Sequence, residues 1–427
     1  MKIGIDISLL QTAHRRRGIG YTLINFVNHL PKEAKQDHTF VLYHYPINDD
    51  DPFDLLDLRG VTYEAREIIP TKLYDTGGRG RFGLLLGMIN HIKTFKDILF
   101  GDSRIKDIDD LGYFLQFDQN HLLPPRRKVP SAQILYDIIP YVMKHDYMWT
   151  YGIARAKGRS RKNSLKQHVR RRLYYWRTRM IARKAQKLLA ISEHTKNDFI
   201  KYMKVRPKKI SVCHLGVEES PVAVPKNPAL DRYVETSWGP LPQKTTLPKG
   251  KFLLFVGGGD QRRKLVDLLA AFNKLRAQGE DVKLALAGDT MRGPNTTPIE
   301  ELNRYFKSTS YMDDIYFLGF VTDKQREWLY ENALAFVYPS VYEGFGLPVI
   351  EAMLRGTPVI TYKNTSIEEV AGSAALYAHN SDTILEQTQK LLTDSKLRGK
   401  YKNLGKKQAS KFSWNETSRC IVKKLLN

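Results

Sequence analysis

Alternation of apolar strands with helices is the feature that most restricts how this chain can fold. Between residues 251 and 378 the sequence predicts strands at 251–259, 282–288, 315–320, 334–340, 358–362 and 374–378, most of them followed by a segment with helical spacing. Several, such as "KFLLFV", are apolar along their whole length, so both faces must be buried. This pattern is typical of a parallel sheet covered by helices on both sides, an α/β doubly wound fold.

The N-terminal half follows the same pattern with longer interruptions. Its expected strands lie at 2–8, 38–45, 61–66, 113–117, 132–138, 187–191 and 210–214. At 427 residues the chain is too long for one ordinary hydrophobic core, so two domains are expected. Residues 219–250 are rich in proline and polar residues and lack periodicity, which indicates a linker. The expected domains are therefore 1–218 and 251–411.

The net charge of the chain, +23, is unusual for a protein of otherwise ordinary globular composition. It predicts a polyanionic partner, which can be nucleic acid, an anionic membrane surface or phosphorylated substrates. The charge is unevenly placed, because residues 151–187 contain 14 lysines and arginines and no acidic residue. The charge restricts the partners of the protein and does not restrict its fold.

The two cysteines, Cys213 and Cys420, provide neither a disulfide framework nor the spacing of a metal site, so a reducing compartment is expected. The N-terminal "MKIGIDISLL" carries an aspartate within its apolar run and is interpreted as a buried strand rather than a signal peptide. No apolar run reaches the roughly 18 residues of a membrane-spanning helix. A soluble or peripheral protein is expected.

The segment "YPSVYEGFGLPVIEAM", residues 338–353, predicts a phosphate-binding turn. A helix is expected over 347–355, with Pro348 in its first turn and Gly356 just after its end. The glycines at 344 and 346 then precede a helix N-terminus, where backbone N–H groups and the helix dipole favour an anion. Glu343 and Glu351 flank this turn, an arrangement that suits a nucleotide sugar with hydroxyls at both ends. The alternative is an ordinary strand–loop–helix turn with two solvated glutamates.

The longer run "YPSVYEGFGLPVIEAMLRGTPVITYKNTSIEEVAG" resembles the E-x7-E signature of retaining glycosyltransferases of family four. The segments "FVGGGDQRRKLVDLLAAF", "LGFVTDKQREWLYENALAFVYPS", "GIDISLLQTAHRRRGIGYTLINFV" and "KFSWNETSRCIVKKLL" are also similar to that family. Together the similar pieces cover most of residues 1–30 and 185–427. The resemblance implies the GT-B fold, two doubly wound Rossmann-like domains facing across a cleft, with a terminal helix, 412–427, that packs back on the N-terminal domain.

The resemblance also implies roles for individual residues. Glu343 would hold hydroxyls of the donor sugar, Glu351 would bind the ribose, and Arg263 and Lys264 would neutralise the diphosphate. Developing negative charge on a leaving phosphate needs such cations. Because Arg262 precedes these two cations directly, the pair that contacts the diphosphate could be shifted by one position. The alternative for residues 262–264 is the solvated start of a helix. The remaining donor-binding residues that the resemblance implies are Gly18, Gly20, Gly344, Phe345, Gly346, Leu347 and Val321.

One position departs from the family. A His-Asp pair is common after the strand that here reads "AQILYDIIP", and this chain has Tyr136 followed by Asp137. A tyrosine is a poor base near neutral pH, although it can orient a hydroxyl. Asp137 stays a candidate catalytic residue, and Tyr136 and His121 are candidate acceptor-orienting residues, with a structural histidine as the alternative for His121. A proton acceptor is not essential here, since in retaining enzymes of this fold the leaving phosphate is thought to take the acceptor proton.

No metal or cofactor is expected. The Asp-Ile-Asp run at 107–109 formally resembles the metal-binding motif of the other large glycosyltransferase fold, but it precedes a strand and is interpreted as a solvated loop. No histidine–cysteine ligand set is present. The resemblance therefore predicts metal-independent transfer.

Residues 151–187 combine their positive charge with Tyr174, Tyr175 and Trp176, and residues 81–100 are apolar with scattered cations. Aromatic residues beside cations suit the headgroup region of an anionic membrane. The alternatives are a solvated basic helix with a buried core helix, or attraction of nucleic acid, for which no recognised module is present.

The sequence thus predicts a hexosyltransferase that uses a UDP-, GDP- or dTDP-sugar and a glycan or lipid-linked acceptor to build a cell-surface polysaccharide or glycolipid. It is expected in the cytoplasm, on the inner face of the cell membrane. Two alternatives remain: a non-catalytic relative that partners an active transferase, favoured by Tyr136, and a nucleic-acid-binding protein.

Overall fold

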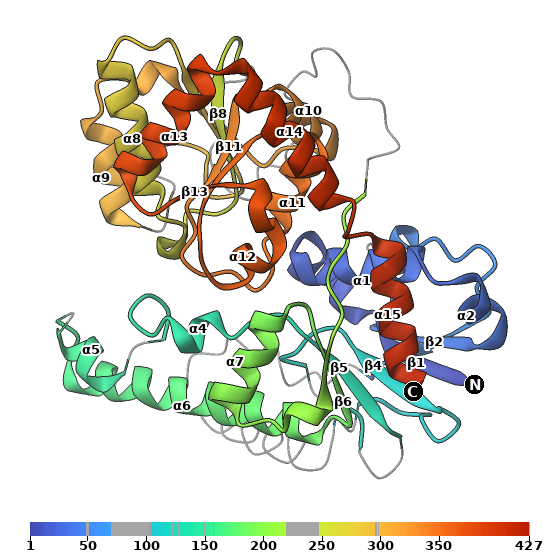
Figure 1. Cartoon of the computed structure of the whole chain (residues 1–427). Coiled ribbons are helices and arrows are strands. Elements are labelled where there is room, and N and C mark those ends of the chain that lie inside the picture. Colours follow the sequence, from blue (N-terminus) through green and yellow to red (C-terminus); the bar gives the residue numbers. More distant parts are fainter. Residues whose placement is uncertain are drawn as a thin grey trace. The chain divides into compact units, whose positions relative to one another are not determined.

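A computed structural model describes residues 1–47, 51–69, 104–121, 129–148, 158–218, 247–294 and 299–426, the stretches 123–125 and 150–156, and residues 102 and 297. The chain forms two compact units (Figure 1). The first unit comprises Met1–Gly216 and Trp414–Asn427, and the second comprises Val217–Ser413. Most of the expected linker, 219–246, and the apolar segment 81–100 lie outside the described residues.

The first unit is built on a parallel seven-stranded sheet of order β3-β2-β1-β4-β5-β6-β7. Its strands are β1 (Lys2–Asp6), β2 (Thr39–His44), β3 (Tyr63–Glu67), β4 (Tyr113–Gln116), β5 (Ser131–Leu135), β6 (Lys187–Ala190) and β7 (Ile210–Val212). All seven strands predicted in this half are confirmed. The central strands are buried along nearly their whole length, because helices cover both faces of the sheet.

The helices of the first unit are α1 (Gly18–Asn28), α2 (Lys32–Asp37), α4 (Ile139–Val142), α5 (Tyr151–Ala156), α6 (Arg161–Lys184), α7 (Glu193–Met203) and α15 (Trp414–Leu426). The terminal helix α15 returns to this unit and packs against α1. Trp414 is buried there, with its ring edge-on to Tyr21 at 5.6 Å between centroids. The last turns of the chain therefore complete the core of the first unit.

Cys213 and Cys420 form a disulfide, with 5.7 Å between their Cα atoms. The expectation that these cysteines are unpaired was wrong, and with it the cysteine argument for a reducing compartment. They are 207 residues apart in the sequence, so spacing gave no signal of the pairing. They meet because Cys213 follows β7 and α15 carries Cys420 back to the same unit.

The second unit contains a parallel six-stranded sheet of order β10-β9-β8-β11-β12-β13. Its strands are β8 (Phe252–Val256), β9 (Lys283–Ala287), β10 (Ile315–Gly319), β11 (Ala335–Tyr338), β12 (Val359–Tyr362) and β13 (Leu376–Ala378). Its helices are α8 (Leu265–Ala277), α9 (Glu300–Ser308), α10 (Asp323–Asn332), α11 (Leu347–Leu354), α12 (Thr365–Ala371), α13 (Ser381–Thr393) and α14 (Ser395–Ala409). Every strand predicted here is confirmed.

Local signals place the helix ends of the second unit correctly. Thr322 accepts a hydrogen bond from the N–H of Gln325, whose side chain accepts one from the N–H of Thr322, so α10 begins in the predicted capping box. Helix α11 has Pro348 in its first turn and Gly356 after its end, with φ of 75°. These positions fix where the loops before the two helices must lie.

Candidate functional site

The second unit gathers its predicted site residues at the carboxyl ends of β8 and β11. These two strands are neighbours, and the chain order reverses between them: β9 and β10 lie on one side of β8, and β12 and β13 on the far side of β11. Such a reversal opens a ligand crevice in doubly wound sheets. The Gly257–Gly259 loop follows β8, and the loop with Glu343 follows β11.

The carboxylate of Glu343 is buried, with the residue 8% exposed, and is held on one side only. Its Oε1 accepts hydrogen bonds from the Tyr338 hydroxyl at 2.7 Å and the Ser340 hydroxyl at 2.9 Å, and from the Arg262 guanidinium. Nε of Arg263 lies 3.5 Å from the same oxygen. Within the described residues no contact engages Oε2, so one carboxylate oxygen is fixed by the protein and the other is open to a ligand.

Glu343 is kept ionised by this environment. Burial pushes its pKa upward, but the charges of Arg262 and Arg263 and the two hydroxyl donors outweigh burial, so the pKa is lowered overall. A buried carboxylate that stays charged can accept hydrogen bonds from sugar hydroxyls and cannot act as a proton donor near neutral pH.

The two arginines are themselves fixed by the loops around them. Arg262 is buried and donates to the carbonyl of Tyr342 at 3.0 Å. Arg263 donates to the carbonyl of Gly258 at 3.0 Å, and its guanidinium lies 5.8 Å from the centre of the Tyr338 ring. The carboxylate of Asp260 also lies 3.7 Å from Arg262 and 3.3 Å from Arg263, so the two guanidinium groups face two carboxylates, and a diphosphate would compete with Asp260 for them.

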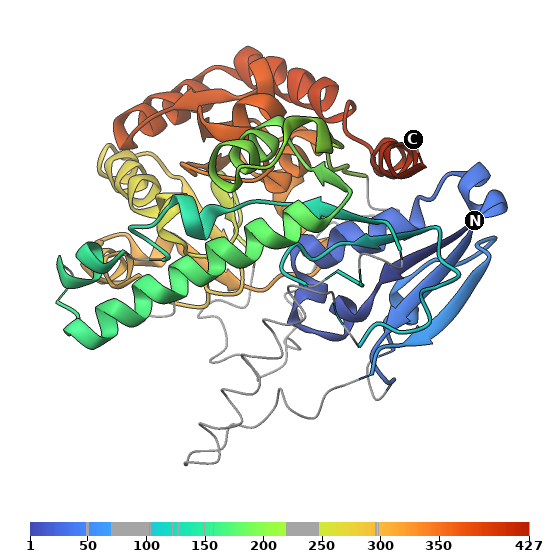
Figure 2. The ribbon, with the colours of Figure 1, turned by 90° about the horizontal axis from the view of Figure 1, so that it is seen from below.

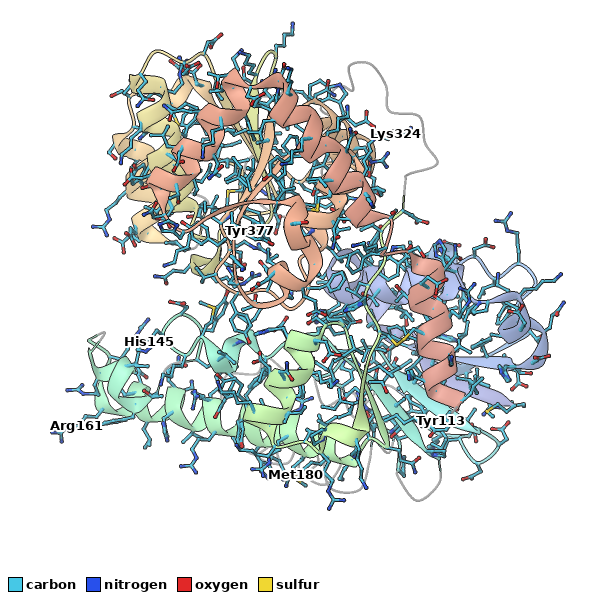
Figure 3. The ribbon with its side chains drawn as sticks, viewed as in Figure 1. Tyr113, His145, Arg161, Met180, Lys324 and Tyr377 are labelled. Atoms are coloured by element: carbon cyan, nitrogen blue, oxygen red, sulfur yellow. A yellow bond between two sulfur atoms is a disulfide. The ribbon has the colours of Figure 1, made fainter. Side chains whose placement is uncertain are left out.

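Lys264 is placed differently from the two arginines. It has a left-handed backbone, with φ of 42°, at the start of α8, and its side chain is exposed. No hydrogen bond or ion pair engages its ammonium among the residues described. It lines a neighbouring cavity of about 510 Å³, bordered also by Asp267, Val341, Tyr362, Lys363, Asn364, Tyr377, Ala378 and His379. Figure 3 labels Tyr377. The structure therefore brings Arg262 and Arg263 to Glu343, while Lys264 turns to this cavity.

Two glycine positions make this geometry possible. A Cβ at Gly257 would lie 3.0 Å from the Arg263 guanidinium, and its φ of 150° is in the range that favours glycine. Gly346 has φ of 101° and precedes α11 directly. The bare backbone thus accommodates a guanidinium at one loop and the sharp entry into a helix at the other.

Glu351 lies in the second turn of α11 and is oriented by α10. Its Oε2 accepts from the Tyr330 hydroxyl at 3.1 Å and lies 3.8 Å from Nε of Arg326. Leu347 is the first residue of α11, where N–H groups have no acceptor within the helix. The helix start and the two glutamates therefore belong to one loop–helix element, as the sequence predicted.

Two other predicted donor-site residues are largely buried. Phe345 packs edge-on against Phe412, with 5.9 Å between ring centroids, so its ring belongs to the core of the unit. Val321, after β10, is also buried. Its neighbour Phe320 was not predicted, yet it is 40% exposed at the carboxyl end of the sheet. The alternation of buried and exposed side chains at the end of a strand was the sequence signal that could have identified Phe320.

In the first unit, Gly18 and Gly20 open α1 but differ in their surroundings. A Cβ added at Gly20 would lie 2.5 Å from the carbonyl oxygen of His14 and 2.6 Å from Cα of Arg15. A Cβ added at Gly18 would have no atom within 4 Å. Gly20 is therefore required by backbone packing, and Gly18 borders open space.

Tyr136 and Asp137 follow β5. The Tyr136 hydroxyl is buried without a hydrogen-bond partner in the described part of the chain, and burial raises the pKa of Tyr136 well above its ordinary value. This tyrosine is therefore not a base. The Asp137 carboxylate accepts from the N–H of Ile139 at 3.0 Å, a contact that orients the turn into α4.

His121 joins a carboxylate cluster that sequence analysis missed. Its Nδ1 lies 3.3 Å from Asp6, at the end of β1, and its Nε2 lies 3.7 Å from Asp118, after β4. Burial acts to lower the pKa of His121, but the hydrogen bond and charge of Asp6 outweigh it and raise the pKa. Part of the signal was available, because Asp118 directly follows a predicted strand, whereas Asp6 lies within the predicted strand 2–8 and ends β1 only in the structure.

Most of the basic segment forms α6, in which Tyr174, Tyr175 and Trp176 are half-buried. Tyr175 and Trp176 pack against the hydrophobic core between α6, α7 and β6, and Tyr175 stacks on Tyr141 at 4.9 Å. Burial raises the pKa of Tyr174. The packing therefore leaves only part of each ring for the contact with lipid headgroups that the sequence predicts, and that contact stays a prediction.

Among the residues described, no group of three or more histidine, cysteine, aspartate or glutamate side chains is arranged to hold a metal ion. None of the helices in the described ranges has the length and apolarity to cross a bilayer. The Asp107–Asp109 run lies in the loop before β4, where the carbonyl of Asp107 accepts from the Tyr43 hydroxyl at 2.9 Å.

Comparison with known proteins identifies relatives along the chain. The O-antigen chain mannosyltransferase B of Escherichia coli is 30% identical over 240 residues, which are 56% of this chain and 60% of that protein. The serotype-specific mannosyltransferase WbdA of Escherichia coli is 24% identical, over 99% of this chain and 47% of WbdA. The chain thus covers about half the length of these relatives.

A model of the family "Glycosyl transferases group 1" matches residues 241–408, which include every site residue of the second unit described above. The crystal structure of Anabaena Alr3699/HepE in complex with UDP and glucose superimposes with a TM-score of 0.61 at 16% identity, covering 100% of this chain and 99% of that one. At this identity the likeness shows the fold. The chain therefore has the GT-B fold, and its residues 241–408 match the model of the glycosyl transferases group 1 family.

Proposed function

We propose that the protein is a retaining glycosyltransferase that moves a hexose from a nucleotide sugar to a glycan or lipid-linked acceptor. The observation that carries this proposal is the buried, ionised Glu343, whose Oε1 is saturated by Tyr338, Ser340 and Arg262 while Oε2 has no partner in the described residues. A fixed carboxylate with one open oxygen is an acceptor for the paired hydroxyls of a hexose.

In this proposal the second unit provides the diphosphate site. The phosphates lie at the N-terminus of α11, beside Gly346 and Leu347, where free N–H groups and the helix dipole favour negative charge. Arg262 and Arg263 stabilise the charge that develops when the sugar–phosphate bond breaks. This assignment moves the cationic pair one position from the Arg263 and Lys264 expected earlier, and leaves Lys264 for the adjoining cavity.

The reaction joins the anomeric carbon to an acceptor hydroxyl as its bond to the β-phosphate oxygen breaks. The acceptor proton passes to the departing phosphate, so nucleoside diphosphate is released and the configuration is retained. No protein base is required, which agrees with the unsuitability of Tyr136 as a base. No metal is assigned to a step, since the two arginines provide the positive charge. Asp137 keeps only the role that the resemblance implies, as do Gly18 and Gly20.

The remaining parts of the donor are assigned by position. Glu351, held by Tyr330, binds the ribose, and the exposed ring of Phe320 beside Val321 provides a stacking surface for the base. A UDP-, GDP- or dTDP-sugar fits this arrangement. The related mannosyltransferases of O-antigen chains support a hexose donor and an acceptor in cell-surface polysaccharide synthesis.

The proposal includes a location on the cytoplasmic face of the cell membrane; this location rests on the basic segment 151–187, since the Cys213–Cys420 disulfide gives it no support. Nucleotide sugars and a lipid-linked acceptor meet at that surface. A non-catalytic relative that partners an active transferase is the second candidate, favoured by the tyrosine at position 136.

Donor binding and hydrolysis test the proposal. Nucleotide sugars are screened by thermal shift, and a ligand of the native state is expected to raise the melting temperature. With the ligand found, Glu343→Gln should abolish donor hydrolysis and transfer, whereas Glu301→Gln, an exposed carboxylate of the same unit, should leave them unchanged. If Glu343→Gln fails to fold, Glu351→Ala, expected to weaken binding, replaces it. Absence of any nucleotide-sugar shift, or hydrolysis that survives Glu343→Gln, would refute the assignment.

A further inference from the structure

Helix α6 exposes aliphatic side chains that its own fold does not use. Leu165 is 57% exposed, Val169 is 45% exposed and Leu173 is 57% exposed, and these residues are four positions apart. At 3.6 residues per turn, successive members are offset by only about 40°, so they form one continuous stripe along three turns of the helix. We call this row of three side chains the aliphatic stripe.

The aliphatic stripe lies on the side of α6 opposite the four most buried residues of the helix. Ser164, Thr178, Ile181 and Ala182 are buried against the first unit. On a helical projection the centre of these positions lies about 180° from the centre of the stripe. The N-terminal half of α6 extends beyond the strands of its unit (Figure 2), with Arg161 at the outer end and Met180 nearer the strands (Figure 3). Farther along the same row Trp176 and Met180 pack against the core, whereas Leu165, Val169 and Leu173, nearer the outer end of the helix, stay exposed.

Cations border the aliphatic stripe on both sides. Arg161 and Arg172 project along one border, and Lys166 and Arg170 project along the other, and all four are exposed. Within the described part of the chain, no hydrogen bond, ion pair or ring contact engages any of the four. Other arginines of the same helix are engaged: Arg171 lies 4.2 Å from the ring centre of Tyr141, and Arg177 donates to the carbonyl of Asn120 at 2.6 Å.

We propose that this face of α6 docks onto an anionic lipid bilayer, with Leu165, Val169 and Leu173 inserted below the headgroups and the bordering cations on the lipid phosphates. This inference rests on the membrane location included in the proposed function. It assigns that location to one face of one helix. Aliphatic side chains gain from leaving water, and long cationic side chains reach back to the headgroups beside them. The helix then lies in the plane of the interface rather than across it.

Two other partners fit the face less well. Nucleic acid would engage the cations and aromatic rings, but phosphates give a row of leucine and valine no favourable contact. A protein partner would need acidic groups matched to cations on both borders of the stripe. A bilayer with anionic lipids provides negative charge on every side of an inserted row, and residues 151–187 contain no acidic residue to oppose it.

The test is flotation of the full chain with vesicles of phosphatidylcholine alone and of phosphatidylcholine mixed with phosphatidylglycerol. The wild type is expected to float with the mixed vesicles, with binding weakened by salt but not eliminated, because insertion persists when the charges are screened. Leu165→Ser combined with Leu173→Ser should weaken binding at least about tenfold. Lys166→Gln combined with Arg170→Gln should also weaken it and reduce its salt dependence.

Matched controls separate the stripe from general apolarity and charge. Leu55→Ser removes an exposed leucine of the same unit, 39% exposed, and Lys144→Gln combined with Lys201→Gln removes two exposed cations elsewhere on that unit; neither should change flotation appreciably. Circular dichroism confirms that each variant is folded, which is expected since the substituted side chains are exposed.

Three results would overturn the inference: no wild-type binding to mixed vesicles, binding unchanged by the paired serine substitutions, or a loss of oligonucleotide binding caused by those same substitutions. Donor hydrolysis in vesicle-free solution is measured on the same preparations. The serine variants should keep donor hydrolysis. If the wild type hydrolyses the donor but does not bind vesicles, only the docking is contradicted. If the wild type does not hydrolyse the donor, the proposed function itself is contradicted.

Discussion

At the scale of single residues, the site depends on how buried charges are compensated. Glu343 would be costly to bury alone, and it stays ionised because two arginines and two hydroxyls surround one of its oxygens. Arg262 and Arg263 are balanced by Glu343 and Asp260, so a diphosphate would take the place of Asp260 beside them. In the first unit, Asp6 and His121 form a similar pair at the ends of parallel strands. Such pairs contribute to stability only while both members are charged.

The Asp6–His121 pair makes the first unit sensitive to pH. The pKa of His121 is raised in the folded protein, so its contribution to stability is fully present below the unfolded value of 6.5 and is lost as the pH rises through the folded value. The pKa of Asp6 is lowered, although burial opposes this, so its contribution persists until the pH falls below the unfolded value of 3.8. His121→Asn is therefore expected to destabilise the protein at about pH 5–6 more than at about pH 8.

Urea unfolding followed by tryptophan fluorescence at both pH values measures this difference. His145→Asn is the control, since it removes a histidine of the same unit that lies away from Asp6. An equal loss of stability for His121→Asn at both pH values would contradict the assigned charge pair.

At the scale of elements, the loops after parallel strands and the return of α15 decide what the molecule can do. Predicted strands and helix starts located the loops at 257–264 and 339–346 with an error of two to three residues at the strand ends, because apolar runs and capping residues are local signals. Helix α15 is different. It begins 198 residues after Gly216, at Trp414, and completes the first unit by packing on α1 and by the Cys213–Cys420 disulfide.

Removal of the disulfide should loosen the attachment of α15. The bond closes a loop across 207 residues, and constraint of so long a loop corresponds to roughly 5 kcal/mol in the chain-entropy account, with measured values typically about 2–4 kcal/mol. Cys420→Ser is expected to lower the free energy of unfolding by about 2–4 kcal/mol under oxidising conditions.

Urea unfolding with and without dithiothreitol measures the effect. The reductant should lower the stability of the wild type and leave the stability of Cys420→Ser unchanged. Because the variant has no disulfide, it is the control for any other action of the reductant. If reductant has no effect on the wild type, and two free thiols react in the unfolded protein without it, the disulfide is not formed in solution.

At the scale of the whole molecule, the chain is a continuous second unit inserted into a first unit made of two segments. The second unit has its own sheet and core, including the stacked rings of Phe255, Tyr338 and Phe336. The first unit lacks part of its core without residues 414–427, since Trp414 and Leu425 are buried there. The two units should therefore differ in their ability to fold alone.

A fragment of residues 217–413 is expected to fold cooperatively and to keep a thermal shift with the nucleoside diphosphate of the donor. A fragment of residues 1–216 should be soluble only when residues 414–427 are joined to it by a short linker, which restores the Trp414–Tyr21 contact. Calorimetry and circular dichroism of the fragments measure this. A stable, cooperatively folded 1–216 fragment would show that α15 is dispensable.

The sequence by itself determined the two parallel sheets, their strand order along the chain, and the glycine turn between Glu343 and Glu351. These follow from short-range patterns: apolar runs, caps and glycines act within a few residues. Only the tertiary structure decided which two of three consecutive cations meet Glu343, because that depends on the left-handed turn at Lys264. It also decided the pairing of two distant cysteines and the outward direction of Leu165, Val169 and Leu173. Contacts between segments far apart in the chain produce no local pattern in the sequence from which they could be predicted.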